Sequence, residues 1–379
     1  MLGKNRLAMF LTALFLCFTL AACGGGGGGQ ENPPADSGDN GQPTSSDSGE
    51  VPYIAIVSKG FQHQFWQVVK KGAEQAAADF GVEITFDGPP TESDIAIQVD
   101  MLKSALDKNP AAIALAALDT ESVTEQLTAC MNSGIPVIGF DSGVPNAPAG
   151  SIYATASTNN SAAAAVAAEQ LYRNSDFSSK LASASASAPI YVGVLSQDAT
   201  SDSIISRTSG FIDKLAELIG VGDVQVTGHD KFAKEAANGA KVIITVSVPA
   251  TTAAADMKSA AEAMLTSGRY TAIYGSNENG AGGILAASND GSDFADGAKY
   301  GDIIAIGFDA GKTQRTAVEN GWFYGSVTQD PYSIGYKAVS LAVDAINNKP
   351  ISDPIVDTGA KWYNSENLSD PSISELVYE

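Results

Sequence analysis

The chain has 379 residues, of which 44% are hydrophobic and 8% aromatic, so it can bury the core of one large domain or two ordinary ones. Its formal charge of -21 repels nucleic acid and anionic lipid, which argues against both as partners. Of its three cysteines, Cys130 stands alone in an apolar helical pattern, and we expect a buried, unreactive thiol there.

The first segment is typical of a secretory signal. Lys4 and Arg6 precede an apolar run that ends in Leu20-Ala-Ala-Cys23. The run is too short for a simple membrane span, and its cationic start and small-residue end fit a cleaved signal. Leu-Ala-Ala-Cys resembles the lipobox of bacterial lipoproteins, which implies a signal peptide over residues 1–22 and acylation of Cys23. The alternative is an ordinary signal peptide with a chance cysteine.

Residues 23–50 contain Gly, Ser, Pro, Asn and Asp with almost no apolar side chain, and they predict a flexible tether. The glycine run formally matches a dinucleotide-binding G-x-G-x-x-G. No strand pattern precedes it and no helix pattern follows, so the match predicts nothing.

From Val51 onward, short apolar runs alternate with longer helical patterns. The expected elements are, in chain order, strand Tyr53–Val57, helix Phe65–Phe80, strand Val82–Phe86, helix Ile95–Lys108, strand Ala111–Leu115 and strand Pro136–Phe140. Continuous apolar runs between helices are typical of parallel strands covered on both faces. The sequence therefore predicts a doubly wound α/β fold.

The series then repeats. Pro52–Ser58 has a counterpart in Pro189–Ser196, and Ile135–Asp141 matches Ile303–Asp309 at five of seven positions. Any α/β protein shows some chance likeness between strand ends. Two such pairs in the same order favour two similar lobes.

Asp141 and Asp309 each follow an apolar strand, and ligands of open parallel sheets bind beyond the carboxyl ends of strands. If the lobes face each other, both carboxylates enter one cleft. They could form an acid/base pair as in glycoside hydrolysis, accept hydrogen bonds from vicinal hydroxyls, or simply cap helices. Spacing alone leaves these three interpretations open.

Further polar and aromatic residues lie at strand ends or helix openings: Ser58, His63, Phe65, Trp66, Arg207, Asn277 and Gln329. The adjacent aromatics could be core residues or could stack on a sugar ring at the mouth of a cleft. Amides, carboxylates and a guanidinium beside aromatics suit a neutral polyol, because each hydroxyl is both donor and acceptor.

From Pro52 to about Tyr363, the sequence resembles the type I periplasmic sugar-binding proteins, the ribose-, allose- and galactose-binding subunits of ABC importers. The motifs that carry the resemblance are Phe65-Trp66-x4-Lys71-Gly72-Ala73, Ile135–Asp141, Arg207-x2-Gly210-Phe211, Gly275-Ser-Asn277-Glu278, Ile306-Gly-Phe-Asp309 and Gln329-Asp-Pro331.

The resemblance implies two Rossmann-like lobes joined by a three-strand hinge. It implies that Phe65 and Trp66 pack against a sugar ring. It also implies that the polar positions bond the sugar hydroxyls: Asp141, Asp309, Arg207, Asn277 and Gln329, with Ser58 and His63 in the first loop.

Two positions depart from the ribose binders. Ser142 follows the first aspartate where ribose binders carry Arg, and Val246–Thr252 has no aromatic residue. The stretch Phe86–Thr91 and the ending Lys361–Tyr363 are more similar to the branch that binds furanose signalling molecules and deoxyhexoses. These departures count against ribose, and we expect a monosaccharide as the ligand.

With crossings near Thr158, Gln329 and Ile351, the resemblance implies an N-terminal lobe of residues 51–157 and 330–350. The C-terminal lobe would hold residues 158–329 and 351–379. Closure around the ligand would be a hinge motion.

The expected protein is a monomeric, extracytoplasmic lipoprotein, anchored to the cell membrane, that delivers a monosaccharide to an ABC permease. The alternative is a receptor that signals a furanose autoinducer through a membrane sensor. The sequence has no G-x-S-x-G and no H-E-x-x-H, and its two histidines give little general-base capacity, so we expect no enzyme activity, metal or cofactor. A transcription regulator of this fold would need a helix-turn-helix where the tether lies.

Overall fold

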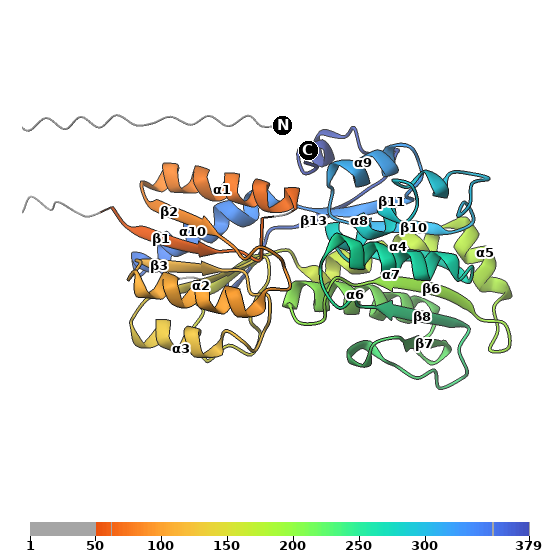
Figure 1. The fold of residues 1–379 in the computed structure, drawn as a ribbon, viewed down its shortest axis with the longest axis horizontal. Coiled ribbons are helices and arrows are strands. Elements are labelled where there is room, and N and C mark those ends of the chain that lie inside the picture. The colour runs from red at the N-terminus through yellow and green to blue at the C-terminus, as the bar shows by residue number, and fades with distance from the viewer. Residues whose placement is uncertain (1–50, 62, 351, 379) are drawn as a thin grey trace, which may run out of the picture. The chain divides into compact units, whose positions relative to one another are not determined.

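The computed structural model describes residues 51–61, 63–350 and 352–378; the expected signal, Cys23 and the tether lie outside them. The described residues form two lobes, each a mostly parallel sheet with helices on both faces (Figure 1). The predicted doubly wound, two-lobed fold is confirmed. Among the helices described, none has the length and apolar character needed to cross a bilayer.

The first lobe contains a six-stranded sheet whose strands are all parallel. Its strands, in sheet order, are β12 (Ile355–Asp357), β5 (Ala154–Ser157), β4 (Val137–Phe140), β3 (Ala112–Leu115), β1 (Tyr53–Val57) and β2 (Glu83–Asp87). Its helices are α1 (Gln64–Phe80), α2 (Ile95–Asp107), α3 (Thr124–Asn132) and α10 (Pro331–Ile346).

The second lobe contains a seven-stranded sheet in which only the edge pair β11–β13 is antiparallel. Its strands, in sheet order, are β13 (Ala360–Tyr363), β11 (Gly325–Gln329), β10 (Ile304–Phe308), β9 (Tyr270–Gly275), β6 (Ile190–Leu195), β8 (Val242–Ser247) and β7 (Val224–Thr227). Its helices are α4 (Asn160–Arg173), α5 (Ser175–Ser183), α6 (Asp202–Ile219), α7 (Ala254–Thr266), α8 (Glu278–Ala286), α9 (Lys312–Glu319) and α11 (Pro371–Ser374), with 3-10 turns at Val221–Asp223, Asp230–Phe232 and Ser292–Phe294.

Strand β1 shows why the apolar runs are continuous. Ile54 and Ile56 belong to the hydrophobic cluster that includes α1 and α10, whereas Ala55 and Val57 belong to the cluster that includes α2 and α3. Successive side chains of a strand point to opposite faces, and here both faces are covered. Every position must therefore be apolar.

Glycines allow the main helix pairs to approach closely. A Cβ atom on Gly72 would overlap the carbonyl oxygen of Tyr332, and one on Gly335 would overlap that of Val69, so α1 and α10 touch backbone to backbone. In the second lobe, a Cβ on Gly210 of α6 would lie 2.5 Å from a backbone oxygen of α4. Each lobe thus fixes one helix pair by the same means.

Within the described residues, the chain crosses between the lobes three times: at residues 158–159, at Asp330, and at residues 358–359. The third crossing lies beyond the expected position at Ile351, because the short apolar pair Ile355-Val356 extends the first sheet as β12. The Asp357 carboxylate accepts hydrogen bonds from the backbone N–H of Asn159 (3.0 Å) and of Gly359 (2.8 Å). One side chain therefore joins two of the three crossings.

Candidate functional site

Two aspartates occupy equivalent places in the two lobes. Asp141 directly follows β4 and Asp309 directly follows β10, and both have positive φ, 55° and 76°. Their backbone N–H groups donate to the adjacent strands, to the carbonyls of Ala156 (2.9 Å) and Val327 (2.7 Å). Asp tolerates the left-handed region better than most residues. The shared backbone turn brings both carboxylates to one cavity between the lobes.

Arg207 of α6 joins the two carboxylates. Its guanidinium nitrogens lie 3.6 Å from Asp309 Oδ2 and 3.9 Å from Asp141 Oδ1. Nε donates to Asn160 Oδ1 at 2.7 Å, and one terminal nitrogen donates to Gln329 Oε1 at 3.0 Å. The Gln329 amide in turn donates to Asp309 Oδ1 at 2.6 Å. The guanidinium is thus held by acceptors on several sides, as its fixed fork of donors requires.

Lys59 supplies a second buried cation from the first lobe. Its Nζ lies 3.2 Å from Asp141 Oδ2 and 3.8 Å from a Glu92 oxygen, and it donates to Ser203 Oγ of the second lobe at 3.0 Å. Burial opposes its charge, but Asp141 and Glu92 outweigh burial and raise the pKa of Lys59 above its ordinary value. The ammonium is therefore charged at neutral pH.

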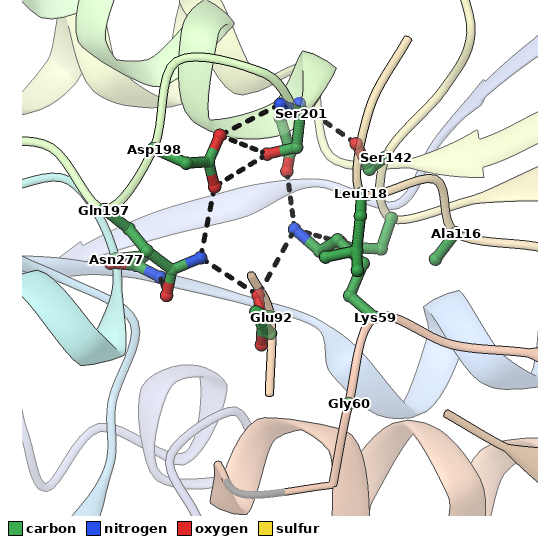
Figure 2. A network of polar contacts seen from close by, with 12 residues as sticks. Lys59, Gly60, Glu92, Ala116, Leu118, Ser142, Gln197, Asp198, Ser201 and Asn277 are labelled. Atoms are coloured by element: carbon green, nitrogen blue, oxygen red, sulfur yellow. Dashed lines mark hydrogen bonds and ion pairs between the residues drawn. The ribbon is translucent and has the colours of Figure 1, made fainter. Parts of the chain in front are cut away.

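Glu92 connects the lobes through a hydrogen-bond network (Figure 2). One carboxylate oxygen accepts from Trp66 Nε1 at 2.8 Å, and the other accepts from Gln197 Nε2 at 3.0 Å. Gln197 Oε1 accepts from Asn277 Nδ2 at 2.8 Å. Burial alone would raise the pKa of Glu92, but Lys59 and these donors lower it below its ordinary value.

Phe65 and Trp66 lie at the start of α1, and both are buried. Their rings meet edge to face with centroids 5.0 Å apart, and the Trp66 ring makes a similar contact with Phe140 at 6.2 Å. Both side chains also line the cavity between the lobes. The two interpretations of this pair, core and cleft wall, therefore describe different faces of the same residues.

The cavity has a volume of about 20 Å³ and draws its walls from both lobes. Its lining consists of Lys59, His63, Phe65, Trp66, Glu92, Asp141, Ile204, Arg207, Asn277, Glu278, Asp309 and Gln329. Eight of the nine residues expected to bind ligand are among them, Ser58 being the exception. The lining includes four carboxylates, a lysine and an arginine, so both donors and acceptors surround a small space.

Ser58 is placed differently from the expectation. Its hydroxyl, with one hydrogen to donate, lies within hydrogen-bond distance of the carbonyls of Gly60 (3.1 Å) and Asp87 (3.0 Å), and a Cβ on Gly88 would overlap it. Ser58 thus holds the loop after β1, and the next residue, Lys59, turns toward the cavity instead. The sequence signal that points to Ser58, a polar residue at the end of a strand, applies equally to Lys59. Glu278, beside Asn277, carries the same signal. Glu92 carries no comparable signal.

The helix-cap interpretation of the two aspartates holds for Asp309 only, and Asn277 caps the same helix. Asn277 Oδ1 accepts from the N–H of Gly280, and Asp309 Oδ2 accepts from the N–H of Glu278, both at 2.9 Å at the start of α8. Asp141 instead meets Lys59 and Arg207. Within the described residues, no group of three or more His, Cys, Asp or Glu side chains is placed to hold a metal ion.

Comparisons with known proteins point to one family. Residues 54–350 match the family model of the periplasmic binding protein domain. A protein from Brachyspira murdochii, described as an ABC transporter, LacI family transcriptional regulator, has a structure that is 41% identical, with a TM-score of 0.70, covering 87% of this chain and 99% of its own. A solute-binding protein from Agrobacterium vitis with bound D-fucose is 25% identical, with a TM-score of 0.71, covering 86% and 100%. The D-allose-binding periplasmic protein of Escherichia coli (strain K12) is 24% identical over 298 residues, 77% of this chain and 83% of that protein.

Proposed function

The chain belongs to the periplasmic binding protein family, and we propose that it captures a monosaccharide between its lobes and delivers it to an ABC importer permease. It does so outside the cytoplasm, as a monomer, and releases the sugar unchanged. The observation that carries the proposal is the convergence of polar side chains from both lobes on one cavity.

The mixture of groups in the cavity suits sugar hydroxyls. Each hydroxyl donates one hydrogen bond and can accept two. Asp141 and Asp309 accept, Arg207 donates, and Asn277 and Gln329 do both. Phe65 and Trp66 add apolar ring surface that can stack on the C–H face of a pyranose or furanose. Charged hydrogen bonds of this kind are the stronger ones, and they would dominate recognition.

Admission of a sugar requires movement. The cavity volume of about 20 Å³ is far below the several hundred Å³ of an ordinary ligand pocket. Three crossings join the lobes in the part of the chain that the structure describes, so a hinge motion there would widen the cavity without unfolding either sheet. Sugar would enter the open form and become enclosed as the lobes approach. The permease could then distinguish the loaded protein by its closed form.

The names of similar proteins narrow the ligand class. The Escherichia coli relative is named for D-allose, and the Agrobacterium vitis structure holds D-fucose. These names support an aldohexose or a deoxyhexose as the ligand. The carboxylates that line the cavity disfavour sugar acids, whose negative charge they would repel.

We also propose that the mature amino terminus is an acylated Cys23, which lies outside the described residues. The lipobox pattern Leu20-Ala-Ala-Cys23 supports it. Mass spectrometry of the protein isolated from its membrane fraction should show a lipid-modified cysteine at the amino terminus. An unmodified terminus at another residue would contradict the anchor and leave sugar binding untouched.

A thermal-shift panel tests the sugar proposal. D-allose, D-fucose, D-arabinose and D-tagatose are each compared with their L enantiomers. A sugar at 100 times its Kd stabilises the native state by about 2.7 kcal/mol, which raises the Tm of a chain of this size by several degrees. We expect at least one D sugar to do so while its enantiomer does not. Equal shifts for both enantiomers, or none for any sugar in the panel, would contradict the proposal.

A further inference from the structure

Two helices, one from each lobe, begin without a side-chain cap of their own. Among the described residues, His63 at the N-cap of α1 and Gly311 at the N-cap of α9 make no side-chain capping hydrogen bond, and neither first turn contains an acidic residue. The first N–H groups of a helix have no partner within it. Helix α1 belongs to the first lobe and α9 to the second.

Each helix receives its cap from the opposite lobe. Glu278, the first residue of α8 in the second lobe, accepts from the N–H groups of Gln64 (3.4 Å) and Phe65 (3.3 Å) with its two carboxylate oxygens. In the reverse direction, Gln64 Oε1 accepts from the N–H of Lys312 at the start of α9, at 2.9 Å. The exchange is reciprocal, because the residue that is capped in the first lobe also caps a helix of the second.

From this geometry we infer that Gln64 and Glu278 form a latch between the lobes. The latch sets how readily the lobes close and thereby sets ligand affinity, but it does not distinguish one sugar from another. Both Glu278 oxygens face backbone N–H groups, so the carboxylate is occupied by the latch, although its side chain borders the cavity. The contacts exist only when the lobes meet. The inference rests on the proposed function for its effect on affinity, but not for the latch itself.

Two neighbours hold the latch in register. Asp309 Oδ2 accepts from the Glu278 N–H at 2.9 Å, which fixes the start of α8 against a residue of the cavity. Gly311 leaves room on the other side, since a Cβ there would lie 2.9 Å from Glu278 Oε1. A methyl group at position 311 would therefore push the carboxylate out of place without removing its charge.

The expected effect follows from a population shift. If the closed form is a minor state of the free protein, a variant that lowers the population of the closed form by some factor weakens the apparent affinity for every ligand by the same factor. A hydrogen bond to a charged group contributes enough that losing the Glu278 caps should weaken binding about tenfold. The factor should be the same for any two sugars, because the latch does not contact hydroxyls.

The test measures hydrogen exchange of individual amides by NMR in the full chain, with and without sugar. In Glu278→Ala, the amides of Gln64 and Phe65 should exchange faster than in the wild type, and in Gln64→Ala the Lys312 amide should. Glu278→Gln keeps one acceptor oxygen and should be intermediate. Glu262→Ala is the matched control, because Glu262 is an exposed carboxylate of α7 whose ion pair joins it to Lys258.

Calorimetry with D-allose and D-fucose provides the second readout. Glu278→Ala and Gly311→Ala should weaken every sugar that binds by one common factor and leave the ranking unchanged. A changed ranking of sugar affinities would mean that Glu278 contacts the ligand. Unchanged hydrogen exchange at the Gln64 and Phe65 amides in Glu278→Ala would mean that no latch exists. If neither sugar binds the wild type, the sugar proposal fails, whereas the exchange experiment still decides the latch.

Discussion

Removal of the Arg207 guanidinium should destabilise the fold as well as the site. In Arg207→Met, the two buried carboxylates of Asp141 and Asp309 lose the cation that lies 3.9 and 3.6 Å away. Asn160 and Gln329 lose their donors at 2.7 and 3.0 Å. Breaking a buried ion pair costs about 3–5 kcal/mol, because an uncompensated charge remains.

The lower end of that range is expected, since each carboxylate keeps another partner: Asp141 keeps Lys59 and Asp309 keeps Gln329. Urea unfolding followed by circular dichroism should thus show a loss of about 3 kcal/mol. Adding Asp309→Asn should recover part of it, because the orphaned charge is then absent.

The control is Arg173→Met in α4, whose exposed pair with Glu169 should contribute less than about 0.5 kcal/mol. If Arg207→Met costs no more than this control, or if Asp309→Asn adds its full cost to that of Arg207→Met, the ion pairs of Arg207 with Asp141 and Asp309 do not stabilise the protein.

Three further predictions concern other buried groups. Glu92→Gln should lower the free energy of unfolding at pH 7. This loss should shrink as the pH falls below the ordinary glutamate range, because the lowered pKa of Glu92 stabilises the fold only while the carboxylate is charged. A loss of stability that grows in acid would refute the charged network. Gly335→Ala should destabilise the protein by about 1–3 kcal/mol or more, because it pushes α10 away from the Val69 carbonyl. Gly282→Ala, with open space around its Cβ, should stabilise α8 by up to about 1 kcal/mol. If urea unfolding shows that both variants change the free energy of unfolding in the same direction, the close helix crossing is contradicted. Burial raises the pKa of Cys130 to about 11, so its thiol should resist iodoacetamide at pH 8 in the native protein and react after unfolding. Intact-mass analysis would show this difference, and rapid alkylation of the native protein would refute the burial of Cys130.

Much of the architecture could be predicted from local pattern. The apolar runs that end at Asp141 and Asp309 lie between helices on both faces, and such runs have few alternatives to buried parallel strands. The strand-end rule then placed both aspartates at the correct edge. The helix beginning near Phe65 could also be predicted from local pattern, because its apolar periodicity spans several turns.

Residues whose roles depend on the opposite lobe could not be predicted in this way. Glu92 lies in a loop, and nothing local indicates that it meets Gln197 across the cleft. Glu278 could be found only as a neighbour of Asn277, because its partners are the backbone N–H groups of α1. The sequence predicts the third crossing too early in the chain, because the edge strand Ile355–Asp357 has three residues and is too short to give a pattern.

The most direct test of sugar binding between the lobes is calorimetric titration of the wild type, Asp141→Ala and Asp309→Ala with the sugar that most raises the Tm. One equivalent should bind the wild type, and each substitution should weaken binding by roughly 2–4 kcal/mol, because hydroxyls and buried donors lose a charged acceptor. Chromatography of the recovered sugar should show it unchanged. Full affinity in both variants, or release of a chemically altered sugar, would contradict the account.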